Sequence, residues 1–469
     1  MADMPNRVCI IGAGSSGISA AKTLKERGIP FDCYEAGDRV GGNWVYENRN
    51  GMSSAYKSLF INTSKPRMQF SDYPMPDHYP VFPHHTQIAE YFNNYVEHFN
   101  VKQHIRFNTT VTSAIPLENG GWEITLHDGS THRYRALLVA NGHHWDPRWP
   151  EPPFEGHFDG SVIHSHYYKT PDAYVDKHVL VLGFGNSAMD IAVETSRVSA
   201  MTYLAVRRGF HIIPKYILGR PLDQQAIPKF IPWAWQRKLI GPIIRLQVGK
   251  LSDFGLPEPD YPILHAHPTV SSEILNRITH GCIKPKPNIQ RLDGDGVIFT
   301  DGSRERVDCI IYCTGYKVTF PFFRPEHIVA KNNDLPVFRR VFHPRYPDLF
   351  FIGLLQPLGA IMPLAELQSK WVSRYLLGKY ALPSPEEMMQ DIQREREEMR
   401  KRYGNSPRHT MQVDVEPYVV GVLKEMERGA KRPQRVPLIK QEAPAARDAS
   451  LSPELTPHLA HQNQRHHQN

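Results

Sequence analysis

Residues 8–35, VCIIGAGSSGISAAKTLKERGIPFDCYE, decide the fold of this 469-residue chain. An apolar run at 8–11 leads into a glycine-rich loop at 12–17, a stretch of helical composition to about Arg27, and a second apolar run at 31–35. Strand, Gly-x-Gly-x-x-Gly, helix and strand in this order are typical of a dinucleotide-binding unit. Gly12 permits the turn out of the strand, Gly14 lets the backbone approach a pyrophosphate, and Gly17 lets helix and strand pack closely. The start of the helix then faces the phosphates.

Glu35 lies at the end of the second strand, 23 residues after Gly12. A carboxylate at this place accepts hydrogen bonds from a ribose 2′-hydroxyl. A free 2′-hydroxyl belongs to FAD or NAD and not to NADP. The first unit is therefore expected to bind FAD or NAD.

A second unit of the same kind begins at His178. The apolar run 178–182 leads into Gly183-Phe184-Gly185-Asn186-Ser187-Ala188, a helix to about 196 and a strand at 201–206. Ala188 stands in place of the third glycine, which the fingerprint tolerates. Where the first unit has Glu35, the second has Arg207 followed by Arg208. A guanidinium at a strand end pairs with a 2′-phosphate, so this unit is expected to bind NADPH.

An internal repeat supports two similar units. Asp128-Gly129-Ser130 leads through an apolar run to Gly142, and Asp301-Gly302-Ser303 leads through another to Gly315, the second glycine standing 13 positions after the first in both copies. Each unit is therefore expected to end in a hairpin and a returning strand. The predicted fold class is α/β, with two Rossmann-like dinucleotide-binding domains.

The composition is that of a globular protein with a modest excess of positive charge. The net charge is +7, and the basic residues are spread along the chain. This distribution favours small anionic ligands over nucleic acid. The five cysteines form no Cys-x-x-Cys pair or zinc-type spacing, and no apolar run approaches the roughly 20 residues that span a bilayer. We therefore expect a soluble, cytoplasmic protein with reduced cysteines and no metal.

The segment 158–168, FDGSVIHSHYY, fits the pattern Phe-x-Gly-x-x-x-His-x-x-x-Tyr. In this segment, the chain resembles the flavin-containing monooxygenases. The resemblance covers about residues 6–372 and includes Gly41-Gly42-Asn43-Trp44, Asn62-Thr63-Ser64-Lys65, Cys313-Thr314-Gly315-Tyr316 and the segment 352–363 with Gln356. His164 is expected to have a structural role in this linker, as part of the hinge between the two units.

The resemblance implies the cofactors FAD and NADPH and the substrate dioxygen. In the family, NADPH reduces FAD, and the C4a-hydroperoxyflavin that forms with dioxygen oxygenates a soft nitrogen or sulfur atom of a small molecule, such as an amine, a sulfide or indole. On its own, Asn62 reads as a turn residue, whereas the resemblance makes it the active-site asparagine. The residues that the resemblance assigns to FAD are Gly12, Gly14, Ser15, Ser16, Gly17, Glu35, Gly42, Asn43, Trp44, Asn62, Thr63, Thr314 and Gln356. Those assigned to NADPH are Gly183, Gly185, Asn186, Ser187, Ala188, Arg207 and Arg208.

The domain organisation follows from these assignments. We expect a discontinuous FAD-binding domain of residues 1–168 and 318–430, with the NADPH-binding domain 169–317 inserted in it. Residues 210–260 mix apolar and basic residues and are expected to form a helical insertion; a substrate-channel wall and a membrane-surface patch are the alternatives. Residues 431–469 turn polar and proline-rich, which predicts a disordered tail. This polar end resembles soluble bacterial-type members of the family. The number of subunits is left open, a homodimer being one option.

Three other functions compete with this interpretation. A Baeyer–Villiger monooxygenase, acting on ketones, has a similar linker, but typically with Trp-Pro where Tyr168-Lys169 stands here. A disulfide reductase needs a redox-active cysteine pair beside the flavin, and Cys309 and Cys313 fall on a predicted buried strand. A non-catalytic flavin-binding sensor would not require a second nucleotide site with Arg207. The sequence therefore favours heteroatom oxygenation.

Overall fold

The fingerprint residues 8–35 form the centre of a parallel sheet. A computed structural model describes residues 5–225, 233–403, 410–433 and 436–442 of the chain. In it, the first sheet has the strand order β23-β7-β1-β2-β3. Its strands are β1 (Val8–Ile11), β2 (Phe31–Tyr34), β3 (Ile105–Arg106), β7 (Ala136–Val139) and β23 (Leu349–Phe351). All neighbours pair in parallel, so β23 joins this sheet about 210 residues after β7.

The two faces of this sheet bury different partners because successive side chains of a strand point to opposite sides. Val8 and Ile10 belong to a core shared with the helices α1 (Ser15–Glu26), α3 (His85–His98) and α7 (Met362–Leu376). Cys9 and Ile11 belong to a second core, shared with the antiparallel strands β4 (Val111–Pro116), β5 (Trp122–Leu126) and β6 (Thr131–Tyr134). A strand covered on both sides is apolar throughout, which explains the continuous run at 8–11.

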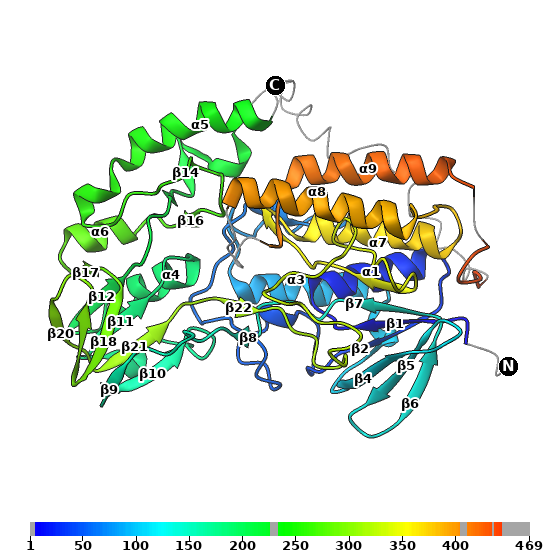
Figure 1. Cartoon of the computed structure of the whole chain (residues 1–469), viewed down its shortest axis with the longest axis horizontal. Helices are drawn as coiled ribbons and strands as arrows, with labels where there is room; N and C mark the ends of the chain where they lie inside the picture. Colours follow the sequence, from blue (N-terminus) through cyan, green and yellow to red (C-terminus); the bar gives the residue numbers. More distant parts are fainter. Residues whose placement is uncertain (1–4, 226–232, 404–409, 434–435, 443–469) are drawn as a thin grey trace.

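The second sheet repeats this plan in the other half of the molecule (Figure 1). Its order is β10-β21-β11-β12-β17, all parallel. The strands are β10 (Ser161–His164), β11 (His178–Leu182), β12 (Met201–Ala205), β17 (Ile283–Lys286) and β21 (Cys309–Tyr312), with the helices α4 (Asn186–Thr195) and α6 (Ile274–Thr279). The neighbouring small sheet is formed by β9 (Gly156–Phe158), β18 (Ile289–Gly294), β19 (Gly296–Phe299) and β20 (Arg304–Arg306). The two predicted hairpins are present as β5–β6 and β19–β20, and the strands that return from them are β7 and β21.

The remaining elements connect and cover the two sheets. Two linkers pair side by side as β8 (Asp146–Pro147) and β22 (Tyr316–Lys317). The 210–260 region and the residues after it contain β13 (Ile212–Ile213), β14 (Tyr216–Ile217), β15 (Arg220–Pro221), the expected helix α5 (Trp233–Val248) and β16 (Thr269–Val270). The C-terminal third adds β24 (Gln356–Leu358), α8 (Pro385–Tyr403), β25 (Gln412–Asp414) and α9 (Val415–Lys431), and α2 (Lys65–Met68) is a single turn. Short 3-10 turns lie at 42–44, 102–104, 172–174, 222–224 and 251–254.

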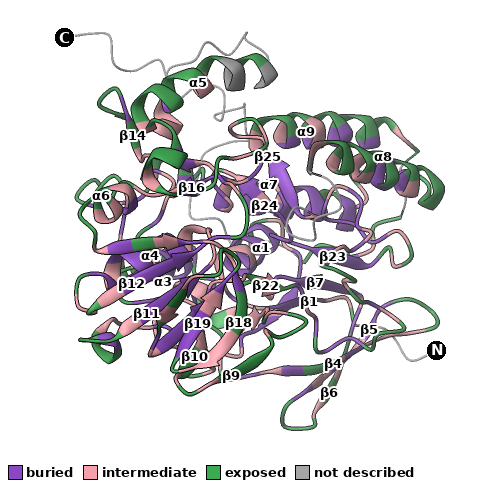
Figure 2. Ribbon diagram, turned by 60° about the vertical axis from the view of Figure 1, so that its left-hand side comes forward, coloured by how far each residue is buried: buried purple, intermediate pink, exposed green. Residues whose placement is uncertain are grey.

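Helix α5 lies at the edge of the molecule and is largely exposed along the length whose burial is described (Figure 2). Leu239 and Leu246 are exposed on it, whereas Ile244 is buried against Ile213 and Ile217. Among the described helices, none combines the length and the apolar character that crossing a bilayer requires.

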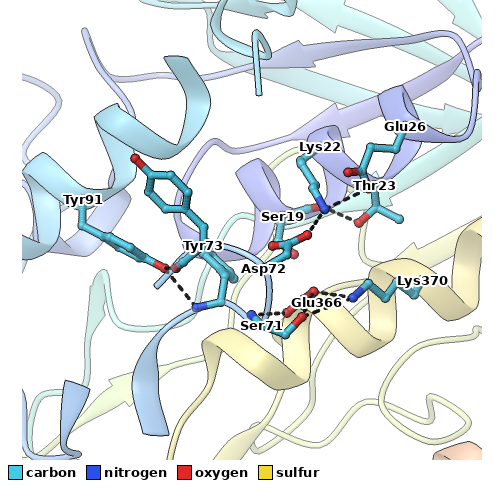
Figure 3. A network of polar contacts seen from close by, with 11 residues as sticks. Ser19, Lys22, Thr23, Glu26, Ser71, Asp72, Tyr73, Tyr91, Glu366 and Lys370 are labelled. Atoms are coloured by element: carbon cyan, nitrogen blue, oxygen red, sulfur yellow. Dashed lines mark hydrogen bonds and ion pairs between the residues drawn. The ribbon is translucent and has the colours of Figure 1, made fainter. Parts of the chain in front are cut away.

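A buried polar network fixes the segment that follows α2 to two helices of the first core (Figure 3). The ammonium group of Lys22 on α1 is almost fully buried and pairs with Asp72 and Glu26. Glu366 on α7 accepts hydrogen bonds from the amide and the hydroxyl of Ser71 and pairs with Lys370. Since a buried charge is costly unless it is paired, these contacts hold residues 71–72 in one place between α1 and α7.

The beginning of the expected tail differs from the prediction. Residues up to Lys431 still belong to α9, and residues 436–442 pack against the first unit. Ile439 is fully buried and its amide donates to the carbonyl oxygen of Leu376, while Lys440 exchanges hydrogen bonds with the side chain of Asn6. Leu438 and Ile439, in a short apolar stretch at the start of the polar tail, pack against the first core, so the overall composition of the tail misplaced the boundary. Residues 443–469 of the expected tail lie outside the described residues.

We expect Ile439→Ala to lower the free energy of unfolding by about 2–5 kcal/mol, because it leaves a cavity where a fully buried side chain packs. Urea denaturation measures this change. Val436→Ala is the matched control: Val436 is 89% exposed, so its truncation should change stability by less than about 0.5 kcal/mol. Equal stabilities of the two variants would show that the segment does not contribute to the first unit.

Candidate cofactor and active site

The first glycine loop runs from the end of β1 to the start of α1 and depends on close backbone contacts. Gly12 has φ of +99°, and a Cβ atom there would lie 2.6 Å from the carbonyl oxygen of Ala140. A Cβ atom on Gly17 would lie 1.8 Å from the carbonyl oxygen of Gly12. Helix α1 begins at Ser15 after Gly14, which provides no side-chain cap. The first amides of the helix therefore remain available to an anion.

Glu35 stands beside this loop and is almost fully buried. Its Oε2 atom accepts a hydrogen bond from the amide of Ala13 at 2.6 Å, and its Oε1 atom accepts one from Gly37 at 2.7 Å. Burial raises the pKa of Glu35, while the two backbone hydrogen bonds act in the opposite direction. Each carboxylate oxygen keeps a further acceptor position. The residue is thus fixed as an acceptor at the place where the fingerprint requires one.

The second glycine loop has the same geometry. Gly183 has φ of +142°, and a Cβ atom there would lie 2.5 Å from the carbonyl oxygen of Cys313, which follows β21 as Ala140 follows β7. A Cβ atom on Gly185 would meet nothing within 4 Å in the described structure, so this glycine borders open space. Ala188 is fully buried where Gly17 stands in the first unit. The chain therefore contains two glycine loops of the same geometry.

Arg207 and Arg208 lie just after β12, separated from it by Val206, and are both exposed. Within the described part of the chain, neither guanidinium has a hydrogen bond or an ion pair to the protein. Free guanidinium groups at the rim of the second loop are suited to a phosphate group.

A single cavity of about 1660 Å³ joins the two loops. Typical sites for one ligand measure roughly 300–1,000 Å³, so this cavity has room for more than one cofactor. It is lined by every predicted site residue except Gly17: Gly12, Gly14, Ser15, Ser16, Glu35, Gly42, Asn43, Trp44, Asn62, Thr63, Gly183, Gly185, Asn186, Ser187, Ala188, Arg207, Arg208, Thr314 and Gln356. Gly17 instead forms the contact between helix and loop.

Three of these residues use their side chains to hold the cavity wall. The Oδ1 atom of Asn43 accepts hydrogen bonds from the amide and the hydroxyl of Ser54, both at 2.8 Å. The Oδ1 atom of Asn186 accepts one from the amide of Val270 at 2.8 Å, and the hydroxyl of Thr314 donates to the carbonyl oxygen of Arg148. Their direct contact with a cofactor remains a prediction.

Asn62 lines the same cavity, just before α2. Residues of the 210–260 region hold its neighbours: Asp223 accepts a hydrogen bond from the amide of Ser64 at 2.7 Å, and Lys215 approaches the carbonyl oxygen of Ile61 at 3.4 Å. Lys215 and Asp223 also line the cavity, with Ile213, Leu222 and Ile240. This region thus contributes to the cavity wall beside Asn62. Its role as a substrate-channel wall remains a prediction.

His164 is fully buried in β10 and lies outside the cavity lining, which includes its neighbour Ser165. Its Nδ1 atom accepts a hydrogen bond from the amide of His166 at 3.1 Å, and its ring lies 5.4 Å from that of Tyr316 on the second linker. Burial lowers the pKa of His164 to about 4, so the imidazole is neutral at pH 7. The hinge role of His164 remains a prediction.

Sequence reasoning missed Tyr56, Asp190 and Glu194, which connect the Asn62 loop to α4. A signal was present in the spacing. Asp190 and Glu194 are four residues apart and therefore share a helix face, where like charges destabilise a helix by a few tenths of a kcal/mol. Two acids in this arrangement indicate that donors from another element face them.

The chain is similar to known proteins of one enzyme family. The family model described as flavin-binding monooxygenase-like matches residues 5–442. Flavin-containing monooxygenase 5 of Rattus norvegicus is 39% identical over 429 residues, 87% of this chain and 80% of the relative. The N-oxide-forming dimethylaniline monooxygenase 2 of Macaca mulatta is 33% identical over 449 residues, 91% of this chain and 83% of the relative. The solved structure of S-allyl-L-cysteine S-oxygenase from Allium sativum matches with a TM-score of 0.67 and 25% identity, covering 90% of this chain and 88% of that chain. The chain belongs to the flavin-containing monooxygenase family, oxidoreductases whose cofactors are FAD and NADPH.

Proposed function

We propose that this enzyme uses NADPH and dioxygen to transfer one oxygen atom to a soft nitrogen or sulfur atom of a small amine, sulfide or indole. The observation that carries the proposal is that both glycine loops and Asn62 line one cavity. The relatives support the substrate class, since one is named for N-oxide formation and another for S-oxygenation.

The residues fit the two cofactors at different ends of the cavity. We assign FAD to the first loop, where the free amides of α1 face a pyrophosphate and Glu35 accepts from a ribose. NADPH is assigned to the second loop, where Gly185 leaves the backbone open to a pyrophosphate and Arg207 and Arg208 pair with the 2′-phosphate. The domain division expected from the sequence is an FAD-binding domain of residues 1–168 and 318–430 and an NADPH-binding domain of residues 169–317. Because β9 and β10, at 156–164, pair with strands of the second half, we place the first boundary before Gly156 and keep the rest of the division.

Bound FAD supplies the redox chemistry, accepting a hydride from NADPH and activating dioxygen. The chain's residues bind, orient and enclose the reactants. Asn62 presents an amide that both donates and accepts hydrogen bonds. Within the described residues its side chain has no hydrogen-bond partner, so both functions are free for reactants in the cavity. We infer that the Asn62 amide orients the oxygen atom to be transferred. No acid–base pair of side chains is required.

Stopped-flow absorbance tests this function. The purified enzyme is reduced anaerobically with NADPH and mixed with oxygenated buffer, while near-ultraviolet absorbance is followed. We expect a long-lived absorbance that decays faster when an amine or a sulfide is added, with the N-oxide or S-oxide as product. Decay accelerated by ketones alone would support the Baeyer–Villiger alternative. Immediate reoxidation without this absorbance would contradict the proposal and indicate an oxidase or a reductase.

A further inference from the structure

We propose that helix α4 couples nucleotide binding at the second glycine loop to the placement of Asn62, with Asp190 and Glu194 as positioning residues. This inference rests on the proposed NADPH site and goes beyond it, because it gives two carboxylates outside the cavity a role in the reaction.

Helix α4 leads away from the second glycine loop. The helix starts at Asn186, directly after Gly185, so its first turn forms part of the proposed pyrophosphate site. Asp190 is four residues from this start and Glu194 a further four, which places them about 6 and 12 Å along the helix axis. One rigid element therefore carries both the nucleotide-binding end and the two carboxylates.

The two carboxylates of α4 accept hydrogen bonds from the segment that precedes Asn62 and from Tyr168. Asp190 accepts a hydrogen bond from the hydroxyl of Tyr56 at 2.5 Å. Glu194 accepts one from Ser58 at 3.0 Å and one from Tyr168 at 2.9 Å, both at its Oε2 atom. Tyr56 and Tyr168 are almost fully buried, so their two bonds are shielded from solvent, whereas the bond from Ser58 is exposed. The donors Tyr56 and Ser58 stand six and four residues before Asn62.

Lys169 holds the beginning of the same segment, at residues 53–57. Its ammonium group donates to the carbonyl oxygens of Ser53 at 2.9 Å and Ala55 at 3.0 Å. The carbonyl oxygen of Lys169 accepts from the amide of Lys57 at 2.9 Å. Lys169 lies in the connection between β10 and β11 of the second sheet, so residues 53–58 are held from this connection and from α4 together. A shift or an ordering of α4 is thereby transmitted to the chain that leads to Asn62.

The energetics favour a role beyond stability. Two acids on one helix face repel each other, and burial penalises the charged form of Asp190. Burial raises the pKa of Asp190 to about 6, although the hydrogen bond from Tyr56 and the charge of Lys215 lower it. By linkage, if nucleotide binding orders the loop, an ordered loop strengthens nucleotide binding by the same factor.

Hydrogen–deuterium exchange of the FAD-loaded enzyme with and without NADP⁺ tests the coupling. In the wild type, we expect NADP⁺ to slow amide exchange both at 183–190 and at 56–64, by about fivefold or more. In the variant Asp190→Ala with Glu194→Ala, protection at 183–190 should remain while protection at 56–64 is lost. The variant Asp190→Asn with Glu194→Gln keeps the acceptor oxygens and should restore most of the protection at 56–64. Glu155→Gln, at an exposed carboxylate of the second half, is the control and should behave as the wild type.

A second variant separates the coupling from a folding defect. Tyr56→Phe with Ser58→Ala removes only the two hydroxyl donors and should give the same selective loss at 56–64. In both defective variants the affinity for NADP⁺ should fall by about fivefold, as the linkage requires, while the yield of oxygenated product per NADPH falls by about fivefold or more and hydrogen peroxide rises.

The outcomes distinguish the two proposals. If NADP⁺ slows exchange at neither segment of the wild type, the proposed nucleotide site itself is wrong. If it protects only 183–190 in the wild type, or if the alanine variant still protects 56–64, the site stands and the coupling through α4 is refuted.

Discussion

Asn62→Ala is expected to lower the rate of organic oxygenation by about 10²–10³-fold, the effect of losing one oriented donor at a reacting oxygen. NADPH oxidation should continue, because the residues assigned to NADPH are unchanged, and its product should become hydrogen peroxide. Parallel assays of NADPH consumption, hydrogen peroxide and N-oxide or S-oxide measure how NADPH oxidation divides between peroxide and oxygenated product.

The control for this variant is Asn93→Ala, since Asn93 lies on the outer side of α3, where its amide donates to Glu97. It should retain wild-type product yields. If Asn62→Ala kept the wild-type ratio of product to NADPH, Asn62 would be a turn residue, as its position alone suggested.

Arg207→Ala combined with Arg208→Ala should raise the KM for NADPH by about 10–100-fold, because a charge-assisted hydrogen bond contributes about 1.5–3 kcal/mol. The KM for NADH, which lacks the 2′-phosphate, should change little. Steady-state kinetics with both nucleotides measure this shift in preference.

Arg291→Ala is the matched control, because Arg291 is also exposed in the second half but pairs with Asp293. It should leave both KM values unchanged. An equal rise for NADPH and NADH in the double variant would place the two arginines at the pyrophosphate and not at the 2′-phosphate.

The sequence predicted the two glycine loops and their returning strands because these depend on short-range rules. A turn at Gly12 or Gly183 requires a residue without a Cβ atom, and the approach of Ala140 or Cys313 leaves no room for another. Such constraints appear in the sequence as fixed residue types at fixed spacing. The position of Glu35 and Arg207 at strand ends follows from the same pattern.

The contacts between distant segments could not be predicted in the same way. Tyr56 and Asp190 are 134 residues apart, and Ser64 and Asp223 are 159 apart. No local pattern records that these pairs meet, since their meeting depends on how the two sheets are oriented. The docking of Ile439 was missed for a related reason: the apolar stretch 436–439 is too short to carry a periodic signal.

The late return of β23 to the first sheet has a consequence for synthesis on the ribosome. The five strands of the second sheet lie within residues 161–312, so all of them have been translated before the first sheet receives its edge strand at 349–351 and the covering helix α7 at 362–376. Domains fold as units once their residues have emerged. The half of the enzyme that starts second in the chain is therefore able to finish folding first, while the amino-terminal half waits with one edge of its sheet unpaired.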